Sequence, residues 1–153
     1  MSGTRAWHLV SRPTGLPDMS NFELRETDLP PLEDGMVRVE NKWLSVDPYM
    51  RGRMNDVKSY VPPFALGEPM QGGAVGKVVE SRSPHYQVGD TVFHMLGWRE
   101  QAVAPAAHTL FGFSRGRWEG TTLVVETDHI AAGYFVHEGT PPSDRIKTVE
   151  RFI

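Results

Sequence analysis

Residues 35–44 read GMVRVENKWL, and this stretch sets the expectation for the fold. Apolar and polar side chains alternate along it, which is the two-residue period of a strand with one buried face. Val37 and Val39 share the face that we expect to be buried, and Asn41 and Trp43 extend the same alternation. The stretch therefore predicts a β-strand whose valines enter a core.

Short runs of the same kind fill most of the remaining N-terminal part of the chain. Breakers such as Leu29-Pro30-Pro31 separate them, and the predicted strands cover residues 5–10, 22–27, 36–44, 73–81 and 90–95. The 15 glycines and 12 prolines favour short strands and tight turns over a helical bundle. We expect a mainly β fold, arranged as a partly open β-barrel.

Length and composition exclude several classes of protein. A chain of 153 residues has the size of one domain, and the absence of cysteine removes disulfides, thiolate nucleophiles and cysteine zinc sites. A net charge of −3 with dispersed basic residues excludes a nucleic-acid binder. Arg5 and Arg12 interrupt any signal-peptide core, and no apolar run approaches the roughly 20 residues of a membrane span. We expect no membrane partner and a cytoplasmic location.

The stretch SVDPYMRGRM, residues 45–54, follows the central strand. Pro48 fixes its own φ near −65° and restricts the preceding residue, so the corner aims Tyr49 in one direction. Such a corner presents a site residue in some proteins and is an ordinary turn in others, and both interpretations remain open from the residues alone. For Arg51 and Arg53, a contact with phosphate or another domain and a solvated or ion-paired side chain are likewise open.

The glycines of the segment 72–76, GGAVG, do not form a dinucleotide fingerprint. That fingerprint needs G-x-G-x-x-G between a strand and a helix, whereas here the glycines open a β-branched run. Close backbone packing is the favoured interpretation. The six histidines include no closely spaced pair that would bring two imidazoles to one ion, so no metal site is predicted.

Four motifs in the same order carry a resemblance to a known family. They are Glu33-Asp34-Gly35, the stretch 44–54, the stretch 66–76 (LGEPMQGGAVG), and Val88-Gly89-Asp90 followed by Gly97-Trp98. Through them, residues 5–105 resemble the N-terminal catalytic domain of the zinc-free medium-chain dehydrogenase/reductases. The branch is the one with NADPH-dependent alkenal/one oxidoreductases, prostaglandin and leukotriene reductases, and curcumin reductase. The resemblance implies a GroES-like β-barrel.

The same resemblance implies a site and its ligands. Tyr49, the catalytic candidate, would lie in the cleft where the nicotinamide and an enone substrate meet, and its phenol would hydrogen-bond an enolate oxygen or a ribose hydroxyl. Met50 and Phe64 would line that substrate cleft, and NADP(H) would be the cofactor, with no residues assigned to bind it. Zinc-dependent relatives carry Gly-His-Glu where this chain reads Gly67-Glu68-Pro69, so no metal is expected.

The chain departs from the family after Ala104. A complete member would continue into a Rossmann domain, and the residues that follow here contain no G-x-G-x-x-G. The tail carries the pattern S-x-G-x-W-E-G-x-T-L-V-V and a later Val149-Glu150-Arg151-Phe152. Through them, residues 109–153 resemble a segment of uncharacterised bacterial β-rich proteins. We therefore expect a barrel domain over residues 1–105 and a tail of different origin over 106–153, with no Rossmann domain.

Two alternating runs flank Glu119-Gly120 in this tail and predict a β-hairpin. Arg115, Arg117 and Glu119 are predicted to form a cross-strand charge ladder, with a ligand site as the alternative. The tail strands either extend the barrel sheet or bury their apolar faces in a second copy. A natural fusion, a recombined reading frame and an engineered chimera all remain open as the origin of the chain.

Two functions follow from these patterns. The first is the catalytic domain of an NADP-dependent, zinc-free enone reductase, truncated and inactive alone because half a cleft does not hold the nicotinamide against its acceptor. The alternative is a non-enzymatic β-barrel module that binds a small apolar ligand or a protein partner. Without a second domain, the face around Tyr49, Met50, Met54 and Phe64 is expected to be exposed and apolar, which predicts a homodimer.

Overall fold

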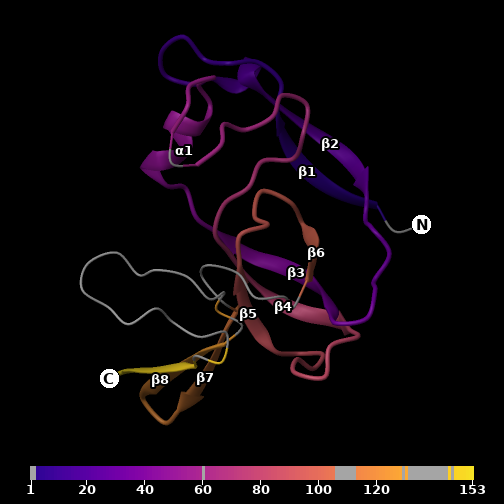
Figure 1. Ribbon diagram of the computed structural model, residues 1–153, viewed down its shortest axis with the longest axis vertical. Helices are drawn as coiled ribbons and strands as arrows, with labels where there is room; N and C mark the ends of the chain where they lie inside the picture. Colours follow the sequence, from indigo (N-terminus) through magenta and orange to yellow (C-terminus); the bar gives the residue numbers. More distant parts are fainter. Residues whose placement is uncertain (1–2, 60, 106–112, 129, 131–144, 146) are drawn as a thin grey trace.

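The computed structural model describes residues 3–59, 61–105, 113–128, 130, 145 and 147–153. These residues form the mainly β fold that the sequence predicts (Figure 1). The strands are β1 (Gly3–Leu9), β2 (Phe22–Asp28), β3 (Met36–Leu44), β4 (Ala74–Ser81), β5 (Thr91–His94), β6 (Gln101–Pro105), β7 (Phe113–Glu119), β8 (Thr122–Asp128) and β9 (Thr148–Phe152). A short 3-10 turn (Met19–Asn21) precedes β2, and the helix α1 (Pro48–Arg53) follows β3.

The strands pair in two antiparallel sheets that remain open. β1 and β2 form a hairpin of their own, and the other strands follow the order β6-β3-β4-β5-β7-β8-β9. β3 lies between β4 and β6, so the alternating stretch 35–44 forms a central strand. The predicted partial barrel with a hairpin extension is therefore confirmed. In the part of the chain that the structure describes, no helix has the length and hydrophobicity needed to cross a bilayer.

β3 contributes its valines to the core as predicted, but its last residues do not keep the alternation. The register against β4 shifts between Asn41 and Trp43, so Lys42 is an extra residue in a β-bulge. Val37 and Val39 have no exposed surface, whereas Trp43 is 76% exposed. The expectation that Trp43 shares their face is wrong, because the bulge turns the side chains beyond it to the other side.

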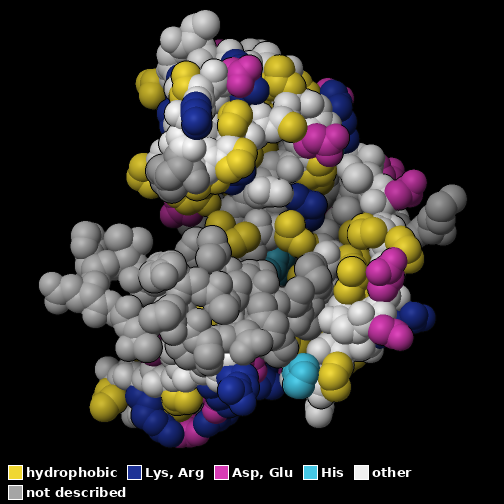
Figure 2. Space-filling view, viewed as in Figure 1, with side chains coloured by type: hydrophobic (Ala, Val, Ile, Leu, Met, Phe, Trp, Pro, Cys, Tyr) yellow, Lys and Arg dark blue, Asp and Glu magenta, His cyan; other side chains and the backbone are white. Residues whose placement is uncertain are grey.

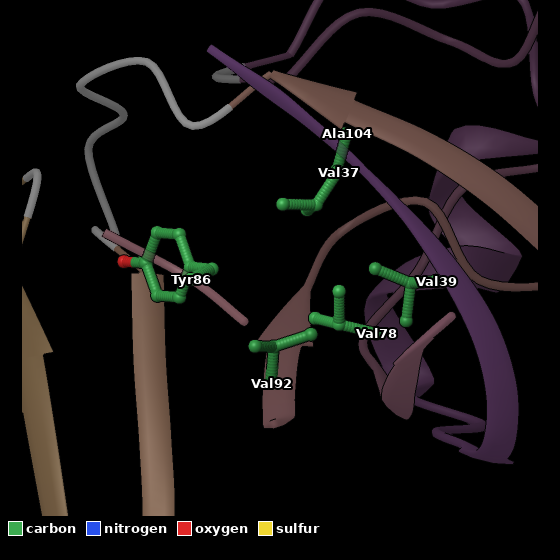
Figure 3. Packing of buried hydrophobic residues seen from close by; sticks show 6 residues of the cluster. All are labelled: Val37, Val39, Val78, Tyr86, Val92 and Ala104. Atoms are coloured by element: carbon green, nitrogen blue, oxygen red, sulfur yellow. The ribbon is translucent and has the colours of Figure 1, made fainter. Parts of the chain in front are cut away.

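The barrel core is formed by side chains from β3, β4, β5 and β6 together with the loop that precedes β5 (Figure 3). Its buried members are Val37, Val39, Val78, Tyr86, Val92 and Ala104. Glycines allow the strands to approach closely there: a Cβ at Gly76 would lie 2.5 Å from the carbonyl oxygen of Glu40, and one at Gly73 would lie 3.1 Å from the Phe93 ring. The predicted role of the 72–76 glycines in close backbone packing agrees with these distances.

A second core lies between β1, α1 and the loop before β4. Its buried members are Leu9, Met50, Met54, Phe64 and Met70, and the rings of Trp7, Phe22, Tyr49 and Trp98 pack against them. Met50, Met54 and Phe64 are only 3%, 6% and 4% exposed. The expected exposed apolar patch at these residues is therefore wrong: the β1–β2 hairpin and the chain's own loops cover them.

The hairpin extension is continuous with the barrel sheet. β5 pairs with β7 through Val92 opposite Arg115 and Phe93 opposite Ser114, and β7 and β8 form the predicted hairpin with Gly120 in its turn at φ +64°. β9 then pairs with β8 and forms the edge of the sheet. Of the two alternatives left open for the tail strands, extension of the barrel sheet is the one found.

Candidate functional site

The Asp-Pro corner is a rigid entry into α1. Ser45 Oγ donates a hydrogen bond to Asp47 Oδ2 at 2.6 Å, and the extended Asp47 is followed by Pro48 as the first residue of the helix. The Met50 amide donates to the Asp47 carbonyl at 3.0 Å and closes the first turn. Because Pro48 fixes φ at the helix start, the side chain of Tyr49 projects from α1 in a defined direction.

Tyr49 lies where α1 meets a pocket of about 230 Å³. The lining residues are Pro48, Tyr49, Gly52, Arg53, Asn55, Val57, Ser59, Val61 and Pro63. The pocket mixes apolar walls with hydroxyl, amide and guanidinium groups, which is the composition of small-molecule sites. Of the residues expected in the cleft, Tyr49 lines this pocket, whereas Met50 and Phe64 lie beneath it in the second core.

The two arginines of the motif brace loops. Arg51 donates to the carbonyls of Pro13 and Gly15 and to Asn55 Oδ1, at 2.7 to 3.2 Å. Arg53 donates to the Pro62 carbonyl at 2.9 Å, and its guanidinium carbon lies 4.1 Å from the centre of the Phe64 ring. Sequence spacing does not show these backbone carbonyl partners, and a contact of either arginine with phosphate or another domain stays a prediction.

His94 is a buried histidine that is held neutral. Its Nδ1 accepts from the Leu96 amide at 3.0 Å, and its Nε2 lies 2.8 Å from Asn41 Oδ1, so Nε2 carries the proton. Burial, together with the nearby Arg99 charge, lowers the pKa of His94 to about 4. Both ring nitrogens of this histidine thus have partners within the barrel. Among the described residues, no group of three or more His, Asp or Glu side chains could hold a metal ion.

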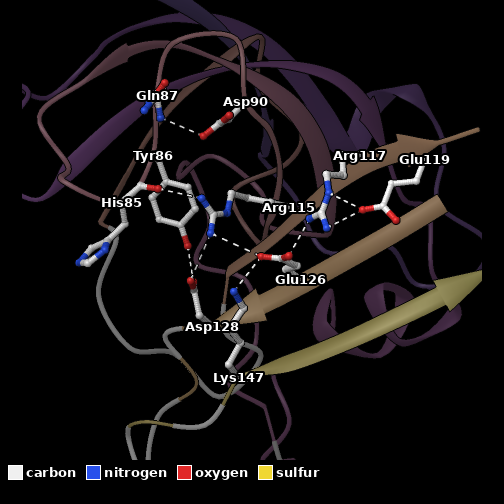
Figure 4. Close-up of polar contacts among 10 residues, drawn as sticks. All are labelled: His85, Tyr86, Gln87, Asp90, Arg115, Arg117, Glu119, Glu126, Asp128 and Lys147. Atoms are coloured by element: carbon white, nitrogen blue, oxygen red, sulfur yellow. Dashed lines mark hydrogen bonds and ion pairs between the residues drawn. The ribbon is translucent and has the colours of Figure 1, made fainter.

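The charged residues of the hairpin form the predicted ladder across β7, β8 and β9 (Figure 4). Arg117 lies 2.6 Å from Glu126 and 2.8 Å from Glu119, while Lys147 and Arg151 close the row from the other side, each at 2.8 Å from one of these glutamates. Hydrogen bonds from Lys147 and Arg117 lower the pKa of Glu126 to about 2. In Figure 2 basic and acidic side chains gather side by side over β7 and β8. Because the charged groups of the ladder pair with one another, they are poorly suited to bind a charged ligand.

Tyr86 connects the barrel core to this ladder. Its ring is 1% exposed in the core, and its hydroxyl donates to Asp128 Oδ1 at 2.6 Å. Arg115 lies 5.1 Å from the centre of the same ring and donates to the His85 carbonyl at 3.0 Å. Burial raises the pKa of Tyr86, so the hydroxyl keeps the proton that it donates. The sequence does not predict this contact, because no spacing rule relates a loop tyrosine to an aspartate on a distant strand.

Comparisons with known proteins match the barrel part of the chain. Residues 5–111 match a family model described as the N-terminal domain of oxidoreductase. The NADPH-dependent curcumin reductase of Escherichia coli (strain K12) is 47% identical over 100 residues, which are 65% of this chain and 29% of that protein. The NADP-dependent 2-alkenal reductase of Nicotiana tabacum is 42% identical over 102 residues, 64% of this chain and 30% of that protein.

Solved structures agree with these matches. The crystal structure of CurA from Vibrio vulnificus superposes with a TM-score of 0.64 at 40% identity, covering 67% of this chain and 30% of that one. A crystal structure of the same protein in complex with NADPH superposes with a TM-score of 0.63. The chain thus spans about three tenths of the length of the relatives it matches.

Proposed function

The chain belongs to the family of oxidoreductase N-terminal domains, in the reductase branch that its motifs resemble, and from this membership we propose that it supplies the substrate side of an enone reductase. The proposed reaction is reduction of the carbon–carbon double bond of an enone or alkenal with NADPH. The observation that carries the proposal is that Tyr49, which follows the Asp-Pro corner, lines a pocket of about 230 Å³.

The chemistry assigns a definite role to the Tyr49 hydroxyl. NADPH, when bound, supplies a hydride for the β-carbon of the substrate. Negative charge then develops on the carbonyl oxygen, and a phenol that donates a hydrogen bond to this oxygen stabilises the charge. The apolar walls of the pocket, such as Val57, Val61 and Pro63, would exclude water around the reacting carbons.

We propose that the described residues of this chain meet the reacting end of the cofactor and not its pyrophosphate. The pocket at Tyr49 offers Ser59, Asn55 and Arg53 as polar partners, whereas the sequence has no G-x-G-x-x-G turn to hold a pyrophosphate. We therefore expect the 153-residue chain to bind NADPH no tighter than millimolar and to show no turnover alone. Calorimetric titration with NADPH and an assay with 2-nonenal test this expectation, and submillimolar binding with turnover would contradict it.

A chimeric enzyme tests the role of Tyr49 itself. In it, residues 5–105 of this chain replace the matching segment of the Escherichia coli curcumin reductase, its 47% identical relative. We expect NADPH-dependent reduction of 2-nonenal, with kcat/KM lowered about 100-fold by Tyr49→Phe. Tyr86→Phe is the control, because this hydroxyl belongs to the other core. A folded chimera without turnover, or a Tyr49→Phe variant with full kcat/KM, would contradict the proposal.

The alternative function, a non-enzymatic module that binds through the same cleft, is not favoured by these comparisons, since the named relatives are reductases. The homodimer remains a proposal, supported now by the hairpin extension. Trp118 and Phe152 lie in one cross-strand row with Leu123 and are 70% and 54% exposed. Light scattering of Trp118→Ser tests it: a dimer that persists unchanged, or a wild-type monomer of 17.2 kDa, would exclude this contact.

A further inference from the structure

A groove distinct from the Tyr49 pocket runs between the β1–β2 hairpin and the end of β3. Its volume of about 480 Å³ lies within the size range of small-molecule sites. The apolar lining comes from Trp7, Leu24, Trp43, Leu44 and Trp98. The groove and the Tyr49 pocket share no lining residue.

Trp43 is the most exposed aromatic ring of this groove. It is 76% exposed because the bulge at Lys42 turns it out of the barrel. Leu24 and Leu44 beside it are 43% and 45% exposed. An indole and two leucines gathered at one concave surface leave apolar area in water that a planar apolar body would cover.

The charges of the groove are balanced except for one. Arg5 pairs with Glu100, and the ammonium group of Lys42 lies 2.7 Å from a carboxylate oxygen of Glu40. Arg99 has no carboxylate within ion-pair distance among the residues that the structure describes. Within the described residues its hydrogen bonds go to backbone carbonyls: Nη2 donates to Met70 at 3.1 Å and Nε to Gly97 at 3.3 Å. A guanidinium has five N–H donors, so donors remain, including those of Nη1.

Partial burial makes this unpaired cation costly. Desolvation lowers the pKa of Arg99, which shows that the folded chain disfavours the charge where it lies. A charge-assisted hydrogen bond from an anion would relieve that cost.

The turn that carries Arg99 is rigid before any ligand arrives. Trp98 has φ +61°, a left-handed conformation that is strained for a residue other than glycine. The turn is held by hydrogen bonds from the Trp7 amide to the Trp98 carbonyl and from Asn41 Nδ2 to the Arg99 carbonyl, both at 2.9 Å. Surrounding contacts thus impose a conformation that the turn would not adopt alone, as is common where a fold presents a binding group.

We propose that this groove binds a small organic carboxylate with a planar apolar body, whose carboxylate meets Arg99 and whose ring stacks on Trp43. A single unpaired guanidinium beside apolar walls suits a monoanion. A phosphate would call for more donors, such as a cluster of backbone amides, which the described lining does not bring together. The site goes beyond the proposed reductase function and does not depend on it.

Calorimetry on the full 153-residue chain tests the proposal with 2-naphthoate and its neutral counterpart 2-naphthamide. We expect submillimolar binding of naphthoate and about tenfold weaker binding of naphthamide. Trp43→Ala is expected to weaken naphthoate binding about tenfold. Trp118→Ala removes a tryptophan of similar exposure outside the groove and should leave the affinity unchanged.

Arg99→Gln should abolish the preference for naphthoate over naphthamide, and Arg99→Lys should restore part of it. Circular dichroism checks that these variants fold. If Arg99→Gln does not fold, the comparison of naphthoate with naphthamide on the unmodified chain decides whether the carboxylate is recognised. Equal affinity for both probes, equal loss in Trp43→Ala and Trp118→Ala, or no binding at all would overturn the proposal. Tyr49→Phe should not alter naphthoate binding, which separates this test from that of the reductase function.

Discussion

The barrel part and the hairpin extension of this molecule are held together by different interactions. In the barrel, Val37, Val39 and Val78 are at most 1% exposed, and burying one such side chain contributes about 1.5 to 3 kcal/mol. In the described part of β7–β9, only Val124 and Thr127 are buried. Most of the side-chain contacts between these strands are ion pairs near the surface. Exposed ion pairs contribute about 0 to 1 kcal/mol each. The extension therefore depends on the barrel more than the barrel depends on it.

Two glycine substitutions provide the strongest test of this difference. Gly76→Val in β4 would place a side chain 2.5 Å from the Glu40 carbonyl oxygen, and we expect a loss of about 3 kcal/mol or more. Gly116→Val in β7 meets only Leu123 at 3.7 Å, an ordinary contact, and should be nearly neutral. Urea denaturation measures both, and similar midpoints for the two variants would contradict the comparison.

A smaller loss of about 1 to 3 kcal/mol is expected for Gly73→Val, since the Phe93 ring 3.1 Å away can shift where a backbone carbonyl cannot.

Acid should destabilise the barrel before it affects the ladder. Because the pKa of His94 falls from 6.5 to about 4 on folding, the unfolded chain binds a proton between these values that the folded chain does not. This contribution to stability is complete above pH 6.5 and is lost as the pH falls toward 4, by up to about 3 kcal/mol. Unfolding free energies measured across this window should show a flatter slope in His94→Gln, and an unchanged slope would contradict this role of His94.

Tyr86→Phe tests the connection between the two regions. The variant keeps the buried ring and removes the hydrogen bond to Asp128, at an expected cost of about 1.5 kcal/mol. Limited proteolysis should then cut within β7–β9 sooner than in the wild type, while the barrel remains resistant. Equal protection of the extension in both proteins would show that β5–β7 pairing alone anchors it.

The smallest effect is expected from Glu126→Gln in the ladder. The folded pKa of about 2, below the ordinary 4.5, means that the Glu126 contribution is present above pH 4.5 and lost as the pH falls toward 2. Glu126→Gln and high salt should both speed amide hydrogen exchange in β8 and β9 and leave β3 unchanged. Faster exchange in β3 would show that the ladder also supports the barrel.

The sequence predicted the strands whose pattern is local. Alternation located β3, β4 and β5, and the runs on either side of Glu119-Gly120 located the hairpin. It did not predict β6, β9 or α1. The side of the sheet on which Trp43 lies was predicted wrongly. The bulge that sets it depends on pairing with β4, which the local sequence does not show.

The positions of the candidate site residues were predicted in part, while the catalytic role of Tyr49 stays a prediction. The Asp47-Pro48 pair predicted a rigid corner that directs Tyr49, and in the structure Tyr49 lines a pocket. Met50 and Phe64 were expected at the surface of a cleft, but they are buried beneath the β1–β2 hairpin. Which residues that hairpin covers is a tertiary property, and no motif within residues 45–64 encodes it. The groove at Arg99 was missed for the same reason, because its lining comes from strands far apart in the chain.

The central position of β3 has a consequence for the order of folding. Its pairing with β6 joins residues as distant as Met36 and Pro105, so the chain must close a long loop before the barrel core forms. β7 and β8 are neighbours in sequence, and such hairpins form in about 1 to 10 μs. The extension is thus expected to collapse and reopen repeatedly while the barrel is still unformed, and to become persistent only once β5 offers its edge. The slow step of folding is then expected to be formation of the barrel, and stable docking of the extension should follow it.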